Sequence, residues 1–296
     1  MKLIRPNTMT PAMLTSSTAT EAHATYSAGT TYAAGVRVVY ATSIYESLQA
    51  SNLNKQPDTN PLWWTYIGPS NKWAMFDGQV STATTRSASL TAVFSTGIMD
   101  SLAVVGIDAE MVTLTVRDGA GGPIVYQRSA SVTGSEVADW SEYFFTDPTV
   151  RRTIAVFYDI PPFASSVATL EITSGGLVSL GMVTFGRINV LGDSQFGAQA
   201  GVIDYSRKET DEFGNTKFVK RAFAKRLSCS LQVDSLQVNR VQRLMYDMLS
   251  TPALYIATDV PEFSEPMTAF GFYQDFYCVI AGPKVSTYQF EIEGLI

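Results

Sequence analysis

Aromatic side chains gather between Asn60 and Gly78, where NPLWWTYIGPSNKWAMFDG places three tryptophans, a tyrosine and a phenylalanine within nineteen residues. Flat aromatic rings suit sugars, whose C–H groups pack on the ring face while amides and carboxylates bind the hydroxyls. The candidates for a glycan-binding surface are Trp63, Trp64, Tyr66, Asn71, Trp73 and Asp77. In the alternative that we favour, the adjacent Trp63 and Trp64 point to opposite sides of a strand and hold a small domain together.

Residues for acid–base catalysis are scarce. His23 is the only histidine and lies near the N-terminus, which argues against a Ser-His-Asp or Cys-His site and against a histidine metal site. No glycine-rich phosphate loop follows a strand. A carboxylate pair for glycoside hydrolysis has its candidates in Asp77, Asp108, Glu110, Asp139, Glu142 and Asp159, although carboxylates are ordinarily solvated. We therefore expect no enzyme and no catalytic residues, and keep a glycan-degrading enzyme as the weakest hypothesis.

The cysteines indicate neither a disulfide framework nor a metal site. Cys229 and Cys278 are the only two, about fifty residues apart and without CxxC spacing. Free cysteine is usually buried, so both are expected in packed interiors. No metal ligand set and no cofactor is predicted.

Cations concentrate in one segment of an acidic chain. They are Arg207, Lys208, Lys217, Lys220, Arg221, Lys225 and Arg226. Such residues either lie on a solvent-exposed edge strand, where their charges deter edge-to-edge pairing, or form an interface with acidic neighbours. The sequence leaves both interpretations open.

Composition limits the partners that these residues serve. The 296 residues are 46% apolar and 16% charged, as in ordinary soluble globular proteins. The net charge of −6 and a pI near 4.9 argue against a general nucleic-acid binder. No apolar run reaches the roughly 20 residues of a membrane helix, and MKLIRPNTMTPAML lacks the apolar core of a signal peptide. Proteins or neutral polymers are the expected partners, and synthesis and assembly in a cytoplasm are expected.

The elements that must position these residues fall into four predicted segments. Residues 1–25 lack sustained periodicity and are expected to form an extended arm that orders only against another molecule. Residues 26–67 indicate a small β-module. Residues 68–190 contain strand-like runs between turn residues, including EMVTLTVRD and SVATLEIT, which predict a jelly-roll-like antiparallel sandwich. DGAGGP at 118–123 is typical of a hairpin loop.

Residues 191–296 predict a C-terminal α+β domain. GVIDYSRKE and KFVKRAFAKRLSCSLQV flank TDEFGNT, which indicates a long hairpin. DSLQVNRVQRLMYDMLSTP predicts a helix capped by Asp234 or Ser235 and ended by Pro252. Its apolar stripe consists of Val238, Val241, Leu244, Met245, Met248 and Leu249. The strands ALYIATD, DFYCVIAG and TYQFEIEGLI complete a chain that is mainly β.

The segment from Tyr32 to Trp64 resembles small chitin-binding carbohydrate modules. The matching positions are Tyr32, Gly35, Val36 or Val38, Tyr45, Pro57 or Pro61, and Trp63 or Trp64. The chain departs from the family after the second tyrosine, where Leu48 and Gln49 replace exposed aromatic residues. The resemblance thus implies the fold of the module more strongly than its binding face.

A wider resemblance covers most of the chain. The order IRPNTMTPAMLTSS, a Tyr/Gly module, IGPSNKWAMFDG, a sandwich similar to galactose-binding-like domains, and VIDYSRKETDEFGNTKFVKR resembles tail-tip and baseplate proteins of tailed bacteriophages. This implies a structural virion component in a symmetric homo-oligomer that contacts tube, hub or fibre proteins. A host surface glycan is the alternative ligand. Galactose-binding-like domains sometimes hold a structural calcium ion, which the sequence leaves open.

Overall fold

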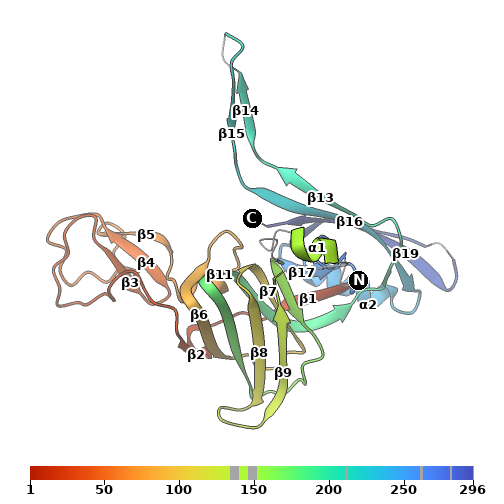
Figure 1. Cartoon of the computed structure of the whole chain (residues 1–296), viewed down its shortest axis with the longest axis horizontal. Coiled ribbons are helices and arrows are strands. Elements are labelled where there is room, and N and C mark those ends of the chain that lie inside the picture. The colour runs from red at the N-terminus through yellow and green to blue at the C-terminus, as the bar shows by residue number, and fades with distance from the viewer. Residues whose placement is uncertain (134–139, 146–151, 211–212, 261–262, 281, 296) are drawn as a thin grey trace. The chain divides into compact units, whose positions relative to one another are not determined.

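The computed structural model describes residues 1–133, 140–145, 152–210, 213–260, 263–280 and 282–295. The chain divides into a terminal unit, Met1–Asn7 with Phe185–Ile296, and a central unit, Thr8–Thr184. Strands account for 53% and helices for 7%, which confirms the predicted mainly β class (Figure 1).

The central unit consists mostly of antiparallel strands. Its elements are η1 (Pro11–Met13), β2 (Leu14–Ser17), β3 (Arg37–Tyr40), β4 (Ser43–Ser47), β5 (Trp64–Pro69), η2 (Ala74–Phe76), β6 (Thr84–Ser95), β7 (Ser101–Asp108), β8 (Met111–Asp118), β9 (Ile124–Ser131), α1 (Trp140–Phe145), β10 (Ile154–Phe157) and the first part of β11 (Ser166–Val190). β3, β4 and β5 form a separate three-stranded sheet, the small module. β6 and β8 both pair with β11. β2 pairs with β6, β9 pairs with β8, and β10 pairs with β7.

Strand periodicity in this unit follows the predicted alternation. Val112, Leu114 and Val116 of β8 are buried, whereas the residues between them are partly exposed. The predicted hairpin at 118–123 joins β8 to β9, and Gly119 and Gly121 have φ of 81° and 74°. Positive φ values of this kind carry little cost in glycine, which explains the composition of the turn. The helix α1 has no counterpart among the predicted elements.

β11 corrects one prediction about strand number. SVATLEIT and LVSLGMVTFGR are parts of one strand, interrupted by a register shift between Thr173 and Leu177. The intervening glycines resembled a turn in the sequence, but they allow a bulge within a strand. β11 also runs across the boundary between the two units, which falls after Thr184.

The terminal unit is a sheet packed against one helix. Its elements are β1 (Lys2–Pro6), the end of β11, β12 (Asp193–Ser194), β13 (Gln199–Asp204), β14 (Arg207–Thr210), β15 (Thr216–Val219), β16 (Phe223–Asp234), α2 (Val238–Asp247), β17 (Ala253–Ile256), β18 (Thr268–Val279) and β19 (Val285–Gly294). The strand order is β11-β1-β17-β18-β19-β16, with β12 and β13 both beside β16. Tyr288, Phe290 and Ile292 of β19 are buried, as the alternation predicts.

Helix α2 covers the core face of this sheet. Val241, Met245 and Met248 are buried against Leu231 of β16 and its neighbours. The predicted cap is wrong, because the helix begins after Gln237 and no side chain caps it. Asp234 instead accepts a hydrogen bond from the backbone N–H of Leu236, at 2.8 Å, and so orders the turn before the helix.

The N-terminal segment is ordered by the chain's own strands, so the prediction for residues 1–25 is wrong. β1 lies between β11 and β17, and β2 pairs with β6. Leu3 and Ile4 are both buried. Consecutive buried residues are typical of a strand covered on both faces, and they give no alternation that sequence inspection would recognise.

Candidate functional site

Trp64 belongs to the core of the small module. Its exposed fraction is 2%, and its ring meets Tyr26 and Tyr32 edge-on at centroid distances of 5.9 and 5.3 Å. The indole N–H donates to the Lys55 carbonyl at 2.7 Å. This carbonyl lies in the loop between β4 and β5, so the tryptophan ties the loop to the sheet. Trp64 has no free ring face for a sugar.

Trp63 and Tyr66 are more accessible. The Lys55 ammonium lies 5.6 Å from the centroid of the half-buried Trp63 ring. Tyr66 is 58% exposed and contacts Tyr45, directly opposite on β4, at 6.0 Å. Burial raises the pKa of Tyr45, and the carboxylate of Asp58 adds to this rise, so the acid lies near the tyrosine pair. Tyr66 is therefore the aromatic residue of this segment that best presents a ring to solvent.

Asn71 has a structural role outside the small module. Its side-chain amide donates to the carbonyls of Thr20 and Thr85, at 2.8 and 2.9 Å, and its oxygen accepts from the Thr85 N–H at 2.9 Å. These bonds use most of the amide's capacity. Asn71 therefore joins two chain segments and has little left to offer a sugar hydroxyl.

Asp77 and Trp73 belong to the turn around η2. The Asp77 carboxylate accepts from the Gln79 N–H at 2.8 Å and from the Thr82 hydroxyl at 2.6 Å. The Trp73 ring packs on Phe76 at 5.8 Å. The structure thus does not assemble the six glycan-binding candidates into one surface.

The carboxylates proposed for hydrolysis are distributed among strand ends. Asp108 ends β7, and Glu110 accepts from the Gly175 N–H at 3.0 Å, beside the bulge of β11. Asp159 is a loop residue with φ of 59°. Asp139 and the side chain of Glu142 lie outside the described residues. The described residues contain no group of three or more His, Cys, Asp and Glu side chains that would hold a metal ion.

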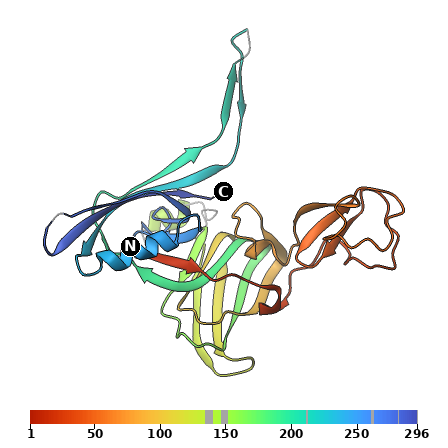
Figure 2. The same cartoon turned by 180° about the vertical axis from the view of Figure 1, so that it is seen from behind.

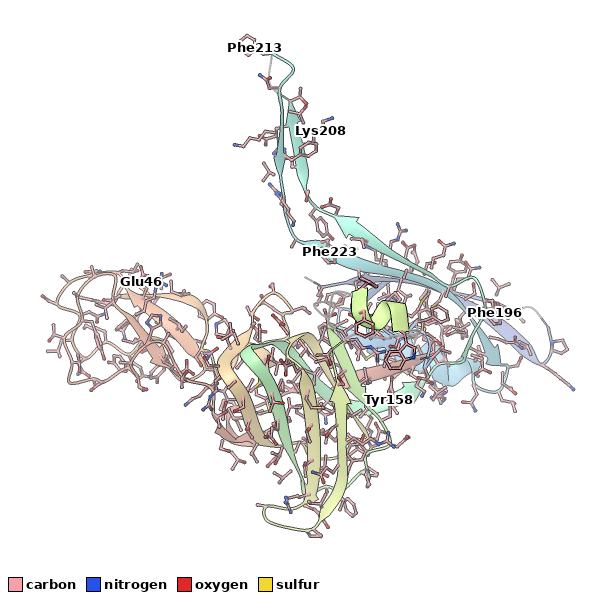
Figure 3. All side chains as sticks on the ribbon, in the orientation of Figure 1. Glu46, Tyr158, Phe196, Lys208, Phe213 and Phe223 are labelled. Atoms are coloured by element: carbon pink, nitrogen blue, oxygen red, sulfur yellow. The ribbon has the colours of Figure 1, made fainter. Side chains whose placement is uncertain are left out.

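The most distinctive feature is a β-hairpin arm, residues 199–226. β13 pairs with the start of β16 at its base, and β14 pairs with β15 further out. This confirms the predicted long hairpin. Figure 1 shows the arm extending from its sheet, and in Figure 3 the labelled side chains of Lys208 and Phe213 project from it. The hydroxyl of Tyr205 donates to Glu293 of β19 at 2.5 Å, which anchors the base.

The cations of the arm fall into two groups. Toward the base, Arg226 pairs with Glu291, and Lys225 lies 3.7 Å from Glu265. Arg207 lies 3.3 Å from its neighbour Glu209. Within the described part of the chain, Lys208, Lys217, Lys220 and Arg221 form no ion pair and are exposed.

Lys220 nevertheless influences a nearby acid. Hydrogen bonds from the side chain and backbone of Ser206 lower the pKa of Asp204, and the charge of Lys220 lowers it further. Asp204 and Lys220 are both exposed, and their opposite charges partly offset each other within the arm.

The arm also exposes apolar side chains that sequence analysis did not select. They are Val202, Tyr205, Phe213, Phe218 and Phe223. Phe223 is the first residue of β16 and pairs with Asp204 of β13, but it lies before Arg226, where β16 begins to pair with β19, and its side chain is exposed. Exposed apolar residues in a strongly charged hairpin are the signal by which sequence analysis could have selected them as candidates for an interaction surface.

The chain matches no protein-family model and no curated protein. Neither described helix has the length and apolar character needed to cross a membrane.

Proposed function

We propose that this chain is a structural subunit of a bacteriophage tail tip or baseplate, which docks through the arm onto neighbouring tail proteins. The observation that carries the proposal is the arm itself, with exposed aromatic residues along a two-stranded ribbon and four exposed cations that form no ion pair with any described residue. The order of sequence motifs resembles that of tail-tip proteins, and this resemblance is the reason for proposing a phage tail as the assembly.

Physical stability supports a docked arm. An isolated two-stranded hairpin is at best marginally stable in water, because it buries little apolar surface. β14 is exposed throughout, and β15 is exposed except at Val219. A neighbour that covers Phe218 would bury apolar area, and acidic residues on it would select the register of contact.

Within this proposal the other parts have distinct roles. The central unit contains a galactose-binding-like sandwich that is displayed outward, and the terminal unit is an α+β docking domain. Repeated subunits around a tail axis would place the arms in a closed symmetric ring.

Charge reversal in the arm tests the docking role. Phage carrying Lys220→Glu with Arg221→Glu should assemble particles that lack this chain, because both residues are exposed and free of ion pairs within the described residues. Arg128→Glu with Lys284→Glu makes the same change in charge at exposed positions outside the arm and should be incorporated normally. Cryo-electron microscopy of the particles gives the readout. Normal particles from the arm variant, or wild-type particles without this chain at the tail tip, would refute the proposal.

Glycan recognition by the small module is a second candidate, favoured by the exposed ring of Tyr66 beside Tyr45 and Asp58. Tyr66→Ala should then abolish retention of the purified chain on host-surface polysaccharide while the module stays folded. Gln127→Ala, on the exposed surface of β9, is the matched control. Retention unchanged by Tyr66→Ala would contradict this assignment.

A further inference from the structure

A hollow lies where helix α2 ends against β18. It is lined by Met248, Leu249, Ser250, Phe272 and Tyr273, with a volume of about 410 Å³. The hydroxyl of Tyr273 donates to the Met245 carbonyl of α2 at 2.9 Å, which fixes this wall against the helix. Leu249 is 61% exposed at the rim. The hollow is thus open to solvent and is lined mostly by apolar and aromatic side chains, with Ser250 among them.

The surroundings of the hollow favour the binding of a positively charged group. The last turn of α2 contains no basic residue, so the negative end of the helix dipole is not offset there. Asp247, which directly precedes the lining residue Met248, is exposed, and Asp275 is exposed two residues beyond Tyr273 on β18. Two exposed carboxylates thus lie close in sequence to the residues that line the hollow.

The arm presents the complementary pair of side chains. Phe218 of β15 lies directly opposite Lys208 of β14, so both side chains project from the same face of the ribbon. Phe218 is 74% exposed, and Lys208 is exposed as well. An aromatic ring next to a cation matches an apolar hollow next to carboxylates.

The arm of a chain does not fill the hollow of the same chain. In Figures 1 and 2 the ribbon of β14 and β15 leads away from α2, and both belong to the terminal unit. The charge distribution points to a second copy as the partner. Residues 199–226 contain seven cations and four carboxylates, whereas the remaining chain contains 14 cations and 23 carboxylates. The arm of one copy is thus attracted to the body of another.

We propose that Phe218 of one copy inserts into the hollow formed by Met248, Leu249, Phe272 and Tyr273 of the next copy, with Lys208 facing Asp247 and Asp275. This inference rests on the proposed assembly role and names the partner of the arm. The contact joins two different surfaces, so it is heterologous and repeats head to tail. A closing rotation yields a ring, in which every arm and every hollow is occupied.

Self-association of the purified full-length chain tests the contact. Analytical ultracentrifugation should detect oligomers of the wild-type chain at micromolar concentration, and Phe218→Ala should raise the dissociation constant at least tenfold. Val202→Ala, which truncates another exposed apolar residue of the arm, should leave it within about twofold. Circular dichroism shows whether each variant is folded.

Mixing two defective variants tests the head-to-tail geometry. Phe218→Ala retains the hollow, and Leu249→Arg retains the arm, so each alone should be monomeric. Their mixture should form 1:1 dimers that grow no further, because only one intact contact exists per pair. Oxidation of a chain with Phe218→Cys and Leu249→Cys should give a ladder of covalent oligomers.

Three results would overturn the inference: a wild-type chain that stays monomeric, oligomers unaffected by Phe218→Ala, or a variant mixture that stays monomeric. None of them bears on the docking role itself. Particles that contain the chain with its arm against a different tail protein would leave the proposed function standing and refute only the partner named here.

Discussion

Two neighbouring tryptophans show how differently adjacent residues contribute to the small module. Trp64 is buried and ties the loop carbonyl of Lys55 to the sheet, whereas Trp63 is only half-buried. The sequence predicts that adjacent strand residues point to opposite faces, but alternation does not say which of the two faces the core. The later tyrosine, Tyr66, shares the face of Trp64 and yet is exposed, because the core ends before it.

Truncating the buried tryptophan should unfold the small module. Trp64→Ala is expected to lower its free energy of unfolding by about 3–5 kcal/mol, through lost burial and a residual cavity. Tyr66→Ala should cost less than about 1 kcal/mol, because most of its ring is already in water. Hydrogen exchange of β3, β4 and β5, followed by mass spectrometry, measures both. Equal protection in the two variants would contradict the assignment of Trp64 to the core.

The two cysteines should differ in reactivity. Burial raises the pKa of the Cys229 thiol from 9.0 to about 11, whereas Cys278 is half-buried. In the folded chain at pH 9, alkylation should therefore reach Cys278 first, and denaturant should remove the difference. Peptide mapping of the alkylated chain identifies the site.

The raised pKa of Cys229 also predicts a direction for stability. An unfolded thiol ionises near pH 9.0, while the folded one keeps its proton until about pH 11. The contribution of Cys229 to stability is thus complete below pH 9 and is lost as the pH rises through 11, because unfolding then releases a proton. The Cys229→Ala chain should lack this part of the loss of stability at alkaline pH. Urea unfolding at several pH values measures the loss, and a loss as large as that of the wild-type chain would refute the prediction.

At the scale of elements, β1 has the largest structural role that its sequence did not reveal. It pairs with β11 on one side and β17 on the other, and Leu3 enters the core that α2 covers. Leu3→Ala should lower the free energy of unfolding of the terminal unit by about 2–5 kcal/mol. Arg5→Ala, on the same strand but exposed, should change it by less than about 0.5 kcal/mol. Urea denaturation followed by hydrogen exchange of β17 provides the measurement, and a Leu3→Ala chain as stable as wild type would contradict it.

Local patterns and long-range pairing account for what could be predicted. Several features depend only on residues close in sequence and could be predicted. They are the alternation in β8 and β19, the hairpin at 118–123, the long hairpin and the apolar stripe of α2. The position of β1 depends on partners about 180 and 250 residues away, which no local period encodes. β18 likewise begins at Thr268, before the run DFYCVIAG that identified it, because its first residues are buried beside β17 and do not alternate.

The same limit explains the candidate sites. Cations of the arm were found from composition, because charge clustering is local. The hollow beneath Leu249 was not, because residues of α2 and β18 meet only in the folded unit. Leu249 itself was assigned to the helix stripe, but the helix ends at Asp247 and leaves it at the rim.

At the scale of the whole molecule, the charge asymmetry predicts how association responds to salt. An arm with an excess of cations contacts a body with an excess of carboxylates, and salt screens this attraction over about 10 Å at 0.1 M and about 3 Å at 1 M. Raising NaCl from 0.05 to 0.5 M should therefore weaken self-association of the full chain by about tenfold, because association rates and register depend on this field. Lys208→Gln should weaken association at low salt and reduce its salt dependence, whereas Arg128→Gln, on β9, should do neither. Sedimentation equilibrium at several salt concentrations measures the slope. Association that strengthens with salt would identify an apolar contact without the charge pairing, and would remove Lys208, Asp247 and Asp275 from the interface while leaving Phe218 in it.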